Sequence, residues 1–269
     1  MNLKKYEKQL LNSLDKFLEK GTMIVKYYGV QDPHGDHIND FVYFCFSKAT
    51  KSLKSIILLI RNDLHEDAMS IVRTIYENYI YAKYCLQFPQ SINNFVVYPL
   101  GKDAGVYFRP SRGKLLDRDG QQIIDYVELT VSEMAKQIGE GLIHTKVYNY
   151  LSDFTHPNFV LIDAFVENGM FTINKDSYKY DVLIYSLYCY FKLTEVVMIL
   201  EDYEEVALTR WLPWLISKTK KQLIEIVNTE IANIEHDILH TSDKDEMKHY
   251  EEVITYYSDL IKNIIGPNQ

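Results

Sequence analysis

The sequence predicts an all-α protein, a single multi-helix bundle of about seven or eight helices with a small β-hairpin or irregular insertion near residues 94–120. The 269 residues include 11 glycines and 7 prolines, about 7% of the chain, where about 12% is usual. Sandwiches, barrels and Rossmann-type folds need these residues at their tight corners, so their scarcity favours long helices. Apolar residues also recur at three- and four-residue steps, which is the spacing of one helix face.

The first part of the chain is predicted to form a helix followed by a helical hairpin. Residues 3–28 carry apolar side chains at helical spacing, with an interruption expected at Gly21. Residues 38–64 and 66–87 carry the same pattern. The polar residues between these two segments favour a tight turn over one continuous helix, so we expect the two helices to pack antiparallel.

Residues 90–120 break the helical pattern. They hold four of the 11 glycines and two of the 7 prolines, with β-prone runs at residues 95–98 and 106–108. We expect an irregular excursion with one β-hairpin, inserted into a single helical domain of residues 1–269. Such an insertion is often a lid or a binding loop, and an ordinary surface excursion is the alternative.

Helical periodicity resumes after the insertion. It covers residues 123–138, 142–151, 204–238 and 247–265. Pro213 marks a kink or a fresh start within the third of these segments. Residues 180–200 form the most apolar predicted helix, with apolar side chains around most of its circumference, and a helix of that kind belongs at the centre of a bundle.

The charge balance excludes some classes of partner. The chain has 29 basic and 37 acidic residues, a net charge of −8, so it has no global positive field to hold nucleic acid. Its apolar runs fall short of the ~20 residues that span a bilayer, and we expect a cytoplasmic protein with no membrane partner. Phosphate-binding glycine motifs and the common zinc and redox motifs are absent, so no cofactor is expected.

Arg73 and Glu77 are the first candidate site residues. They lie four residues apart in a predicted helix whose other faces are largely apolar, so their side chains share one partly buried flank. Partly buried charges need partners. One interpretation is an ion pair that braces the bundle. The other is an arginine kept available for a phosphate or carboxylate and oriented by Glu77.

A second candidate cluster comprises Tyr148, Ser152 and His156, which follow one another at four-residue steps and are expected on one helix face. Pro157 disfavours helical backbone at His156, which places the imidazole at a helix C-terminus, where the helix dipole favours its protonated form. A histidine there can act as a general acid or base, or can cap the last carbonyls of the helix.

His236 and His240 are a weak candidate for a metal site. They lie four residues apart beside acidic residues, so one helix face could present both imidazoles to a metal ion. Only two clear ligands are present, and a solvated helix end explains the same residues. No metal is therefore assigned.

The two clusters together resemble a known bacterial family. A helix with Arg73 and Glu77 followed by aromatic residues, and a later segment with tyrosine, serine and histidine at four-residue steps ending at His156, look like the family of domains of unknown function numbered 5677. The resemblance covers roughly residues 40–200. No general activity is established for that family. Its helical layout is similar to that of HEPN-like proteins, many of which are RNases or partners of nucleotidyltransferases in toxin–antitoxin and phage-defence systems.

The HEPN likeness implies an arginine and a histidine that act on the 2′-hydroxyl and phosphate of RNA. Arg61 and His65 come nearest to that motif, with a spacing one residue too short. The shorter spacing still places both side chains on one helix face. The alternative, which needs fewer assumptions than a catalytic pair, is that Arg61 and His65 belong to a charged turn at a helix end.

Two functions from different classes follow. The first is a metal-independent RNase or nucleotide-acting effector of phage defence or a toxin–antitoxin system, with RNA or a nucleotide as its partner. In that site Arg73 binds phosphate, Glu77 orients Arg73 and His156 moves the proton, and Tyr148 and Ser152 share the cleft. The alternative is a non-catalytic interaction or sensing protein that works through homo-oligomerisation or a partner protein.

Overall fold

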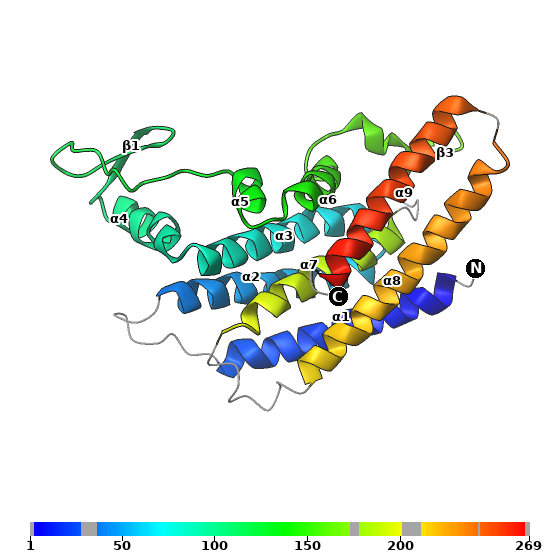
Figure 1. Cartoon of the computed structure of the whole chain (residues 1–269), viewed down its shortest axis with the longest axis horizontal. Coiled ribbons are helices and arrows are strands. Elements are labelled where there is room, and N and C mark those ends of the chain that lie inside the picture. The colour runs from blue at the N-terminus through cyan, green and yellow to red at the C-terminus, as the bar shows by residue number, and fades with distance from the viewer. Residues whose placement is uncertain (1–2, 28–36, 173–177, 201–210, 242, 267–269) are drawn as a thin grey trace.

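The computed structural model describes residues 3–27, 37–172, 178–200, 211–241 and 243–266. Within these residues the chain forms nine α-helices and two short β-hairpins (Figure 1), so the predicted all-α fold with a hairpin insertion is confirmed. The helices are α1 (Leu3–Tyr27), α2 (His37–Ile60), α3 (His65–Gln87), α4 (Tyr98–Asp103), α5 (Val131–Gln137), α6 (Gly141–Asp153), α7 (Lys179–Val197), α8 (Trp211–Ile238) and α9 (Lys244–Ile265). The antiparallel hairpins are β1 (Phe108–Ser111) with β2 (Lys114–Leu116), and β3 (Val166–Glu167) with β4 (Met170–Phe171).

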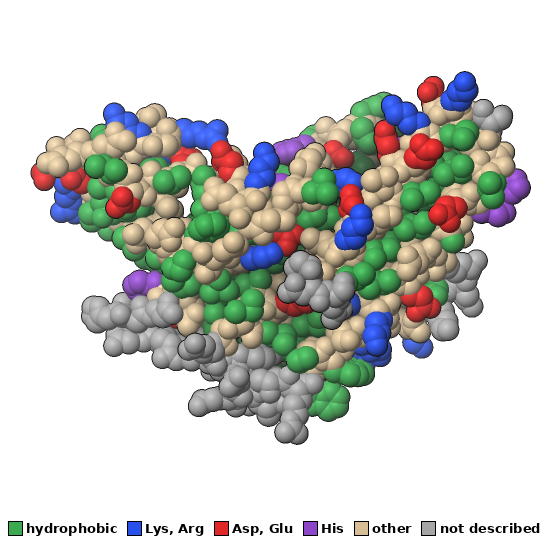
Figure 2. Space-filling model, in the orientation of Figure 1, with side chains coloured by type: hydrophobic (Ala, Val, Ile, Leu, Met, Phe, Trp, Pro, Cys, Tyr) green, Lys and Arg blue, Asp and Glu red, His purple; other side chains and the backbone are tan. Residues whose placement is uncertain are grey.

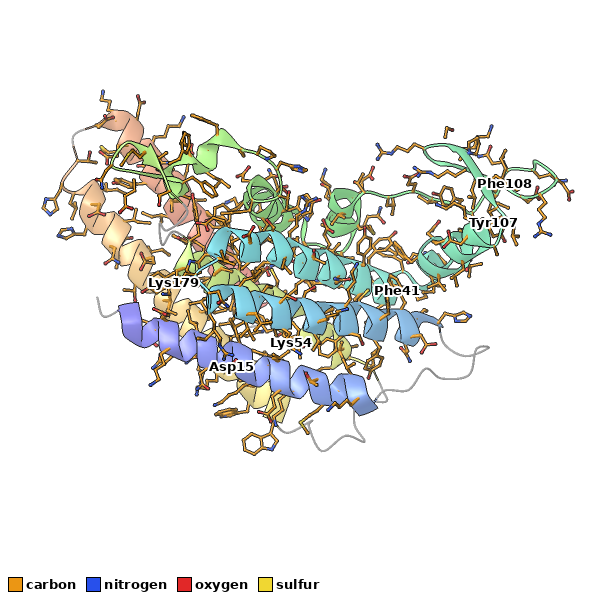
Figure 3. All side chains as sticks on the ribbon, turned by 180° about the vertical axis from the view of Figure 1, so that it is seen from behind. Asp15, Phe41, Lys54, Tyr107, Phe108 and Lys179 are labelled. Carbon is orange, nitrogen blue, oxygen red and sulfur yellow. The ribbon has the colours of Figure 1, made fainter. Side chains whose placement is uncertain are left out.

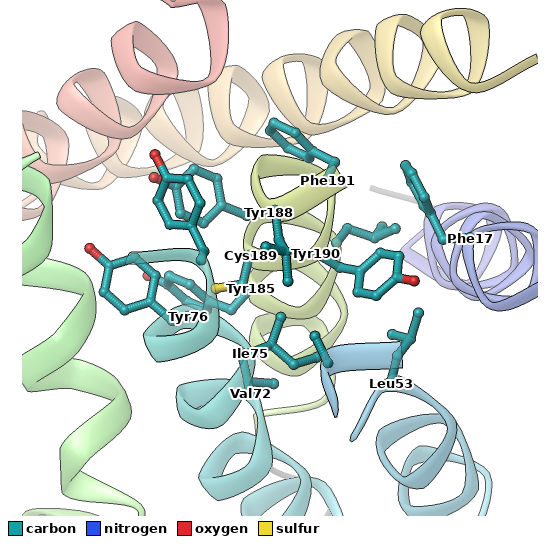
Figure 4. Packing of buried hydrophobic residues seen from close by; sticks show 14 of the residues in the cluster. Phe17, Leu53, Val72, Ile75, Tyr76, Tyr185, Tyr188, Cys189, Tyr190 and Phe191 are labelled. Carbon is teal, nitrogen blue, oxygen red and sulfur yellow. The ribbon is translucent and has the colours of Figure 1, made fainter. Parts of the chain in front are cut away.

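The α2–α3 hairpin and α7 form the centre of the bundle. As predicted, α2 and α3 are joined by a tight turn, and α7 packs against both of them and against α1. The consecutive α7 residues Tyr188, Cys189, Tyr190 and Phe191 are all fully buried (Figure 4). Because four consecutive residues point to every side of a helix, α7 is enclosed all round, in agreement with its apolar pattern.

The remaining elements cover this centre from different sides. α8 packs on α1 and α7, and α9 packs on α8 and α6. The insertion with α4 and β1–β2 projects from one end of the molecule, and the end of α8 and the start of α9 lie at the other end (Figure 1). Figure 2 shows charged side chains of both signs scattered over one face, without a single-sign patch. None of the helices in the described part of the chain has the length and hydropathy needed to cross a membrane.

Helix α1 runs without a break through Gly21, so the expected interruption there is wrong. The glycine is needed for packing, since a Cβ atom at this position would lie 2.0 Å from the Tyr190 hydroxyl oxygen. That buried hydroxyl forms a hydrogen bond of 2.8 Å with the Thr50 hydroxyl on α2. Gly21 therefore makes room for a polar contact between α7 and α2.

The insertion starts with a helix, so the β-prone run expected at residues 95–98 is wrong. Residues Asn93–Val97 form a π-helical turn that leads directly into α4. The Phe95 ring packs on Phe41 of α2, with ring centroids 5.2 Å apart, and on Tyr81 of α3. Packing against the bundle thus overrides local β propensity. The expected hairpin follows as β1–β2, close to Tyr107 and Phe108 in Figure 3.

One predicted helix is shorter than expected. A capping box of Thr130 and Glu133 fixes the start of α5, and residues 123–130 before it are irregular. The described part of the helix predicted over residues 204–238 is α8, and Pro213 is its third described residue. Residues 204–210 of that predicted segment, and the loop before α2, lie outside the described residues.

We predict that Gly21→Ala destabilises the protein by about 1 to 3 kcal/mol, the usual range for overpacking a core. The new methyl group would displace the Tyr190 hydroxyl from Thr50. Urea unfolding measures the change. The control is the double variant Gly21→Ala/Tyr190→Phe, which removes the clashing oxygen and should recover most of the loss. An equal loss in the single and double variants would contradict this packing.

Candidate functional site

Arg73 is the centre of a polar cluster that joins α3 to the end of α6. Its Nε donates to Glu77 Oε1 at 3.0 Å, and its Nη1 donates to Thr155 Oγ1 at 2.8 Å. Its Nη2 donates to the Tyr148 hydroxyl at 2.5 Å, and the guanidinium carbon lies 4.5 Å from the centre of that ring. The Tyr148 hydroxyl in turn donates to Glu77 Oε1 at 3.2 Å. We call these four residues the Arg73 cluster.

The Arg73 cluster is largely occupied with its own members. The Arg73 and Glu77 side chains are 22% and 29% exposed, and each guanidinium nitrogen already has a protein acceptor. Burial, followed by the Glu77 charge, raises the pKa of Tyr148, so this phenol stays protonated at neutral pH. The arrangement fits a clamp between helices better than a guanidinium held open for an anion.

The structure does not place Ser152 and His156 on one helix face, so that expectation is wrong. α6 ends at Asp153, and the chain turns before His156, consistent with the restriction that Pro157 imposes. The Ser152 hydroxyl donates back to the Tyr148 carbonyl oxygen of its own helix. Thr155 makes the contact with Arg73, and His156 is exposed beside it.

His156 lines a large open groove beside the Arg73 cluster. The groove has a volume of about 1110 Å³ and lies between the start of α3, the loop after α6, the 3₁₀-helix Phe159–Ala164 and β4. Its lining residues are Glu66, Asp67, Phe154, Thr155, His156, Pro157, Asn158, Phe159, Leu161, Ile162, Phe165, Phe171 and Thr172. We call it the aromatic groove. Since Thr155 belongs to both, the Arg73 cluster holds one edge of the groove in place.

A smaller hollow of about 310 Å³ lies between α2, α3 and the insertion. Glu77 reaches it from the Arg73 cluster, and Phe41, Tyr81 and Phe95 form part of its apolar wall. The insertion therefore covers one flank of the hairpin, and Glu77 is the link between this hollow and the clamp.

Arg61 and His65 are not presented together to a substrate. The Arg61 Nη2 atom contacts both carboxylate oxygens of Asp15 on α1, at 2.7 and 2.8 Å. His65, the first residue of α3, is fully buried. The turn between the helices therefore directs the arginine outward and the histidine into the core.

His236 is exposed in the last turn of α8, and His240 is exposed in the turn that follows Ile238, so the two do not share a helix face as expected. Their Nε2 atoms are 3.3 Å apart, and His236 also lies 3.7 Å from an Asp237 carboxylate oxygen. Among the residues that the structure describes, no group of three or more histidines, cysteines and acidic residues is arranged to hold a metal ion.

Sequence reasoning missed a second polar cluster, which surrounds the buried side chain of Glu140. The Glu140 Oε1 atom accepts from Tyr79 and from Lys83, both at 2.6 Å, and Oε2 accepts from Asn263 of α9 at 2.7 Å. Lys192 of α7 lies 3.7 Å away. We call these five residues the Glu140 network. The signal that could have found it is the presence of Lys83 and Lys192 in two helices whose apolar spacing predicts that they pack in the bundle.

The Glu140 network fixes the charge of its carboxyl group. Burial alone would raise the pKa of Glu140, but the charges of Lys192 and Lys83 and the hydrogen bonds from Lys83 and Tyr79 lower it to about 2. Burial lowers the pKa of Lys192, while Glu140 and Glu195 act in the opposite direction.

Residues 39–107 match a family model described as a family of unknown function, DUF5677. The predicted resemblance is confirmed for this segment, which contains α2, α3 and the first part of the insertion. It includes Arg73 and Glu77 and ends before Tyr148 and His156. No curated protein and no solved structure matches the chain, so the HEPN likeness stays a prediction.

We predict that Arg73→Ala lowers the free energy of unfolding by about 2 to 3 kcal/mol, because it removes charge-assisted hydrogen bonds and leaves the Glu77 carboxylate without its cationic partner. The control is Arg61→Ala, whose exposed pair with Asp15 should contribute at most about 1 kcal/mol. Urea unfolding of both variants tests this. Equal losses would mean that the Arg73 cluster is no clamp.

We also predict that Glu140→Gln is destabilising at neutral pH by on the order of 3 kcal/mol, from a pKa lowered to about 2. A lowered carboxyl pKa stabilises the fold above the unfolded-state pKa of about 4.3, and this stabilisation is lost as the pH falls toward 2. Urea unfolding between pH 3 and pH 8 should show the gap between wild type and variant narrowing below about pH 4.5. A gap that is constant over this range would contradict the assignment.

Proposed function

We propose that this protein is a non-catalytic helical interaction protein that binds a partner protein in the aromatic groove. The observation that carries the proposal is the exposure of large apolar side chains around the groove. Phe159, Met170 and Phe171 are 78%, 71% and 81% exposed, and Val160 and Phe165 are exposed beside them. Phe159, Phe165 and Phe171 line the groove, and exposed large apolar side chains gathered at one place on a folded chain are typical of a binding site.

The local structure of the 3₁₀-helix Phe159–Ala164 keeps the Phe159 and Val160 side chains exposed. Leu161 and Ala164 of the same 3₁₀-helix are buried, whereas Phe159 and Val160 are exposed. Asn158 caps the segment by accepting from the Val160 backbone N–H, and its amide donates to Asp153. With the start of the segment fixed in this way, Phe159 and Val160 are held facing outward.

The charge around the groove indicates what kind of partner fits. Glu66 and Asp67 line it, and Asp163 is exposed on the same 3₁₀-helix. Residues 147–174 contain no lysine or arginine. An apolar groove with an acidic rim favours a segment with apolar anchor residues flanked by lysines or arginines.

The RNA- or nucleotide-acting function has weaker support. It needs the Arg73 guanidinium to bind phosphate, but the three guanidinium nitrogens are occupied by Glu77, Thr155 and Tyr148. His156 remains an exposed group at the groove that could move a proton. For this reason a ribonuclease assay belongs in the test.

The test uses fluorescence anisotropy with the full chain and labelled helical peptides that carry leucine and phenylalanine anchors, flanked by lysines or by glutamates. We predict that the lysine-flanked peptide binds more tightly. Phe159→Ser and Phe171→Ser should each weaken its binding by about tenfold or more, as anchor residues do. The control is Leu239→Ser, which removes an equally exposed apolar side chain outside the groove.

Two outcomes would contradict the proposal. One is peptide binding that the groove variants leave unchanged. The other is RNA cleavage by the wild type that His156→Ala abolishes, which would favour the effector function. Loss of a homodimer in the groove variants would identify a second copy of the chain as the partner.

A further inference from the structure

A cleft separate from the aromatic groove lies over the Glu140 network. Its volume is about 460 Å³, within the range of roughly 300 to 1,000 Å³ that small-molecule sites occupy. It is bounded by Lys83 of α3, Lys192 of α7, and Lys262 and Asn263 of α9. Figure 1 shows the end of α9, marked C, beside α7 at this place.

Basic groups outnumber acidic groups around this cleft. Its walls contain Lys83, Lys192 and Lys262 against the carboxylates of Glu140 and Asp259. The Asp259 carboxylate already binds Lys262 at 3.2 Å, and Lys146, outside the cleft, at 2.9 Å. The Glu140 carboxylate is occupied by the Glu140 network. The local charge is therefore positive on a protein whose net charge is −8.

Lys192 is the residue that points to a ligand. Its side chain is only 11% exposed, and its Nζ lies 3.7 Å from Glu140 Oε1, beyond hydrogen-bonding distance. That oxygen already accepts hydrogen bonds from Lys83 and Tyr79. The Lys192 Nζ also lies 5.6 Å from the centre of the Tyr79 ring. An ammonium group has three hydrogens to donate, and oxygen acceptors stabilise a charge that is largely buried. Oxygens of an anion in the cleft would complete this set.

The N-terminus of α6 adds to the positive electrostatic potential at the cleft. The N-cap residue of this helix is Glu140, whose carboxylate accepts from the other members of the Glu140 network and makes no capping hydrogen bond to the helix. Leu142 and Ile143 of the first turn line the cleft. The first backbone N–H groups of a helix lack intrahelical acceptors, and the helix dipole is positive at this end. Phosphate groups bind readily to such positions.

We propose that this cleft binds a small phosphate-bearing ligand, with Lys192 and Lys262 donating to its phosphate oxygens. Separate ammonium groups on two helices act as point charges around an oxyanion. Protein binding in the aromatic groove and phosphate binding in this cleft use different residues, so either can hold without the other.

The test is isothermal titration calorimetry of the full chain with inorganic pyrophosphate and with ADP, at constant ionic strength. We expect binding at one site per chain, weakened by about tenfold or more in Lys192→Gln and in Lys262→Gln. Lys262 is 75% exposed, so its variant reports on binding even if Lys192→Gln folds poorly. The control is Lys54→Gln, an exposed lysine on α2 labelled in Figure 3.

The proposal is overturned if neither probe binds to the wild type, or if both cleft variants bind as tightly as the wild type. It is also overturned if Lys54→Gln weakens binding as much as the cleft variants do, because the anion would then respond only to overall charge. Binding of ADP without binding of pyrophosphate would likewise contradict a site that recognises phosphate oxygens.

Discussion

The buried carboxylate of Glu140 is the group on which the arrangement of the central helices depends. α3 and α7 pack against each other in the centre of the bundle, yet they carry Lys83 and Lys192, whose side chains are 32% and 11% exposed. A buried lysine needs an acceptor. Gly139 lies just before Glu140 with a φ of +78°, a conformation that favours glycine, and it reverses the chain between α5 and α6. This turn brings one carboxylate within reach of α3, α7 and α9.

The same requirement applies to the tyrosines, of which the chain has 22. Buried hydroxyls need partners as lysines do, and most of those in the core have one on another helix. Tyr188 of α7 donates to Asn263 of α9 at 2.7 Å, and Tyr190 pairs with Thr50 of α2. The polar groups of the interior thus hold helices together. The features that packing does not explain are the exposed aromatic side chains of the groove and the incompletely partnered Lys192.

The spacing of apolar residues predicts helices and the contacts between residues one helical turn apart, and the described structure agrees with most of these predictions. The α2–α3 hairpin and the central α7 follow from the spacing of apolar residues. The i, i+4 rule places Arg73 beside Glu77, and Tyr148 does lie against both. The same rule fails at His156, because it assumes helical backbone beyond the last turn of α6. Contacts such as Glu140 with Lys83 and Asn263 join residues far apart in the chain, and no spacing indicates them.

The most direct test of whether the central helices depend on the Glu140 carboxylate is a double-mutant cycle between Glu140→Gln and Lys83→Met, followed by urea unfolding at pH 7. The two side chains are in contact at 2.6 Å, so their changes in unfolding free energy should not add. We expect a coupling energy of about 2 kcal/mol, as for a charge-assisted hydrogen bond in a buried site. A coupling within about 0.5 kcal/mol of zero would contradict the central position of Glu140.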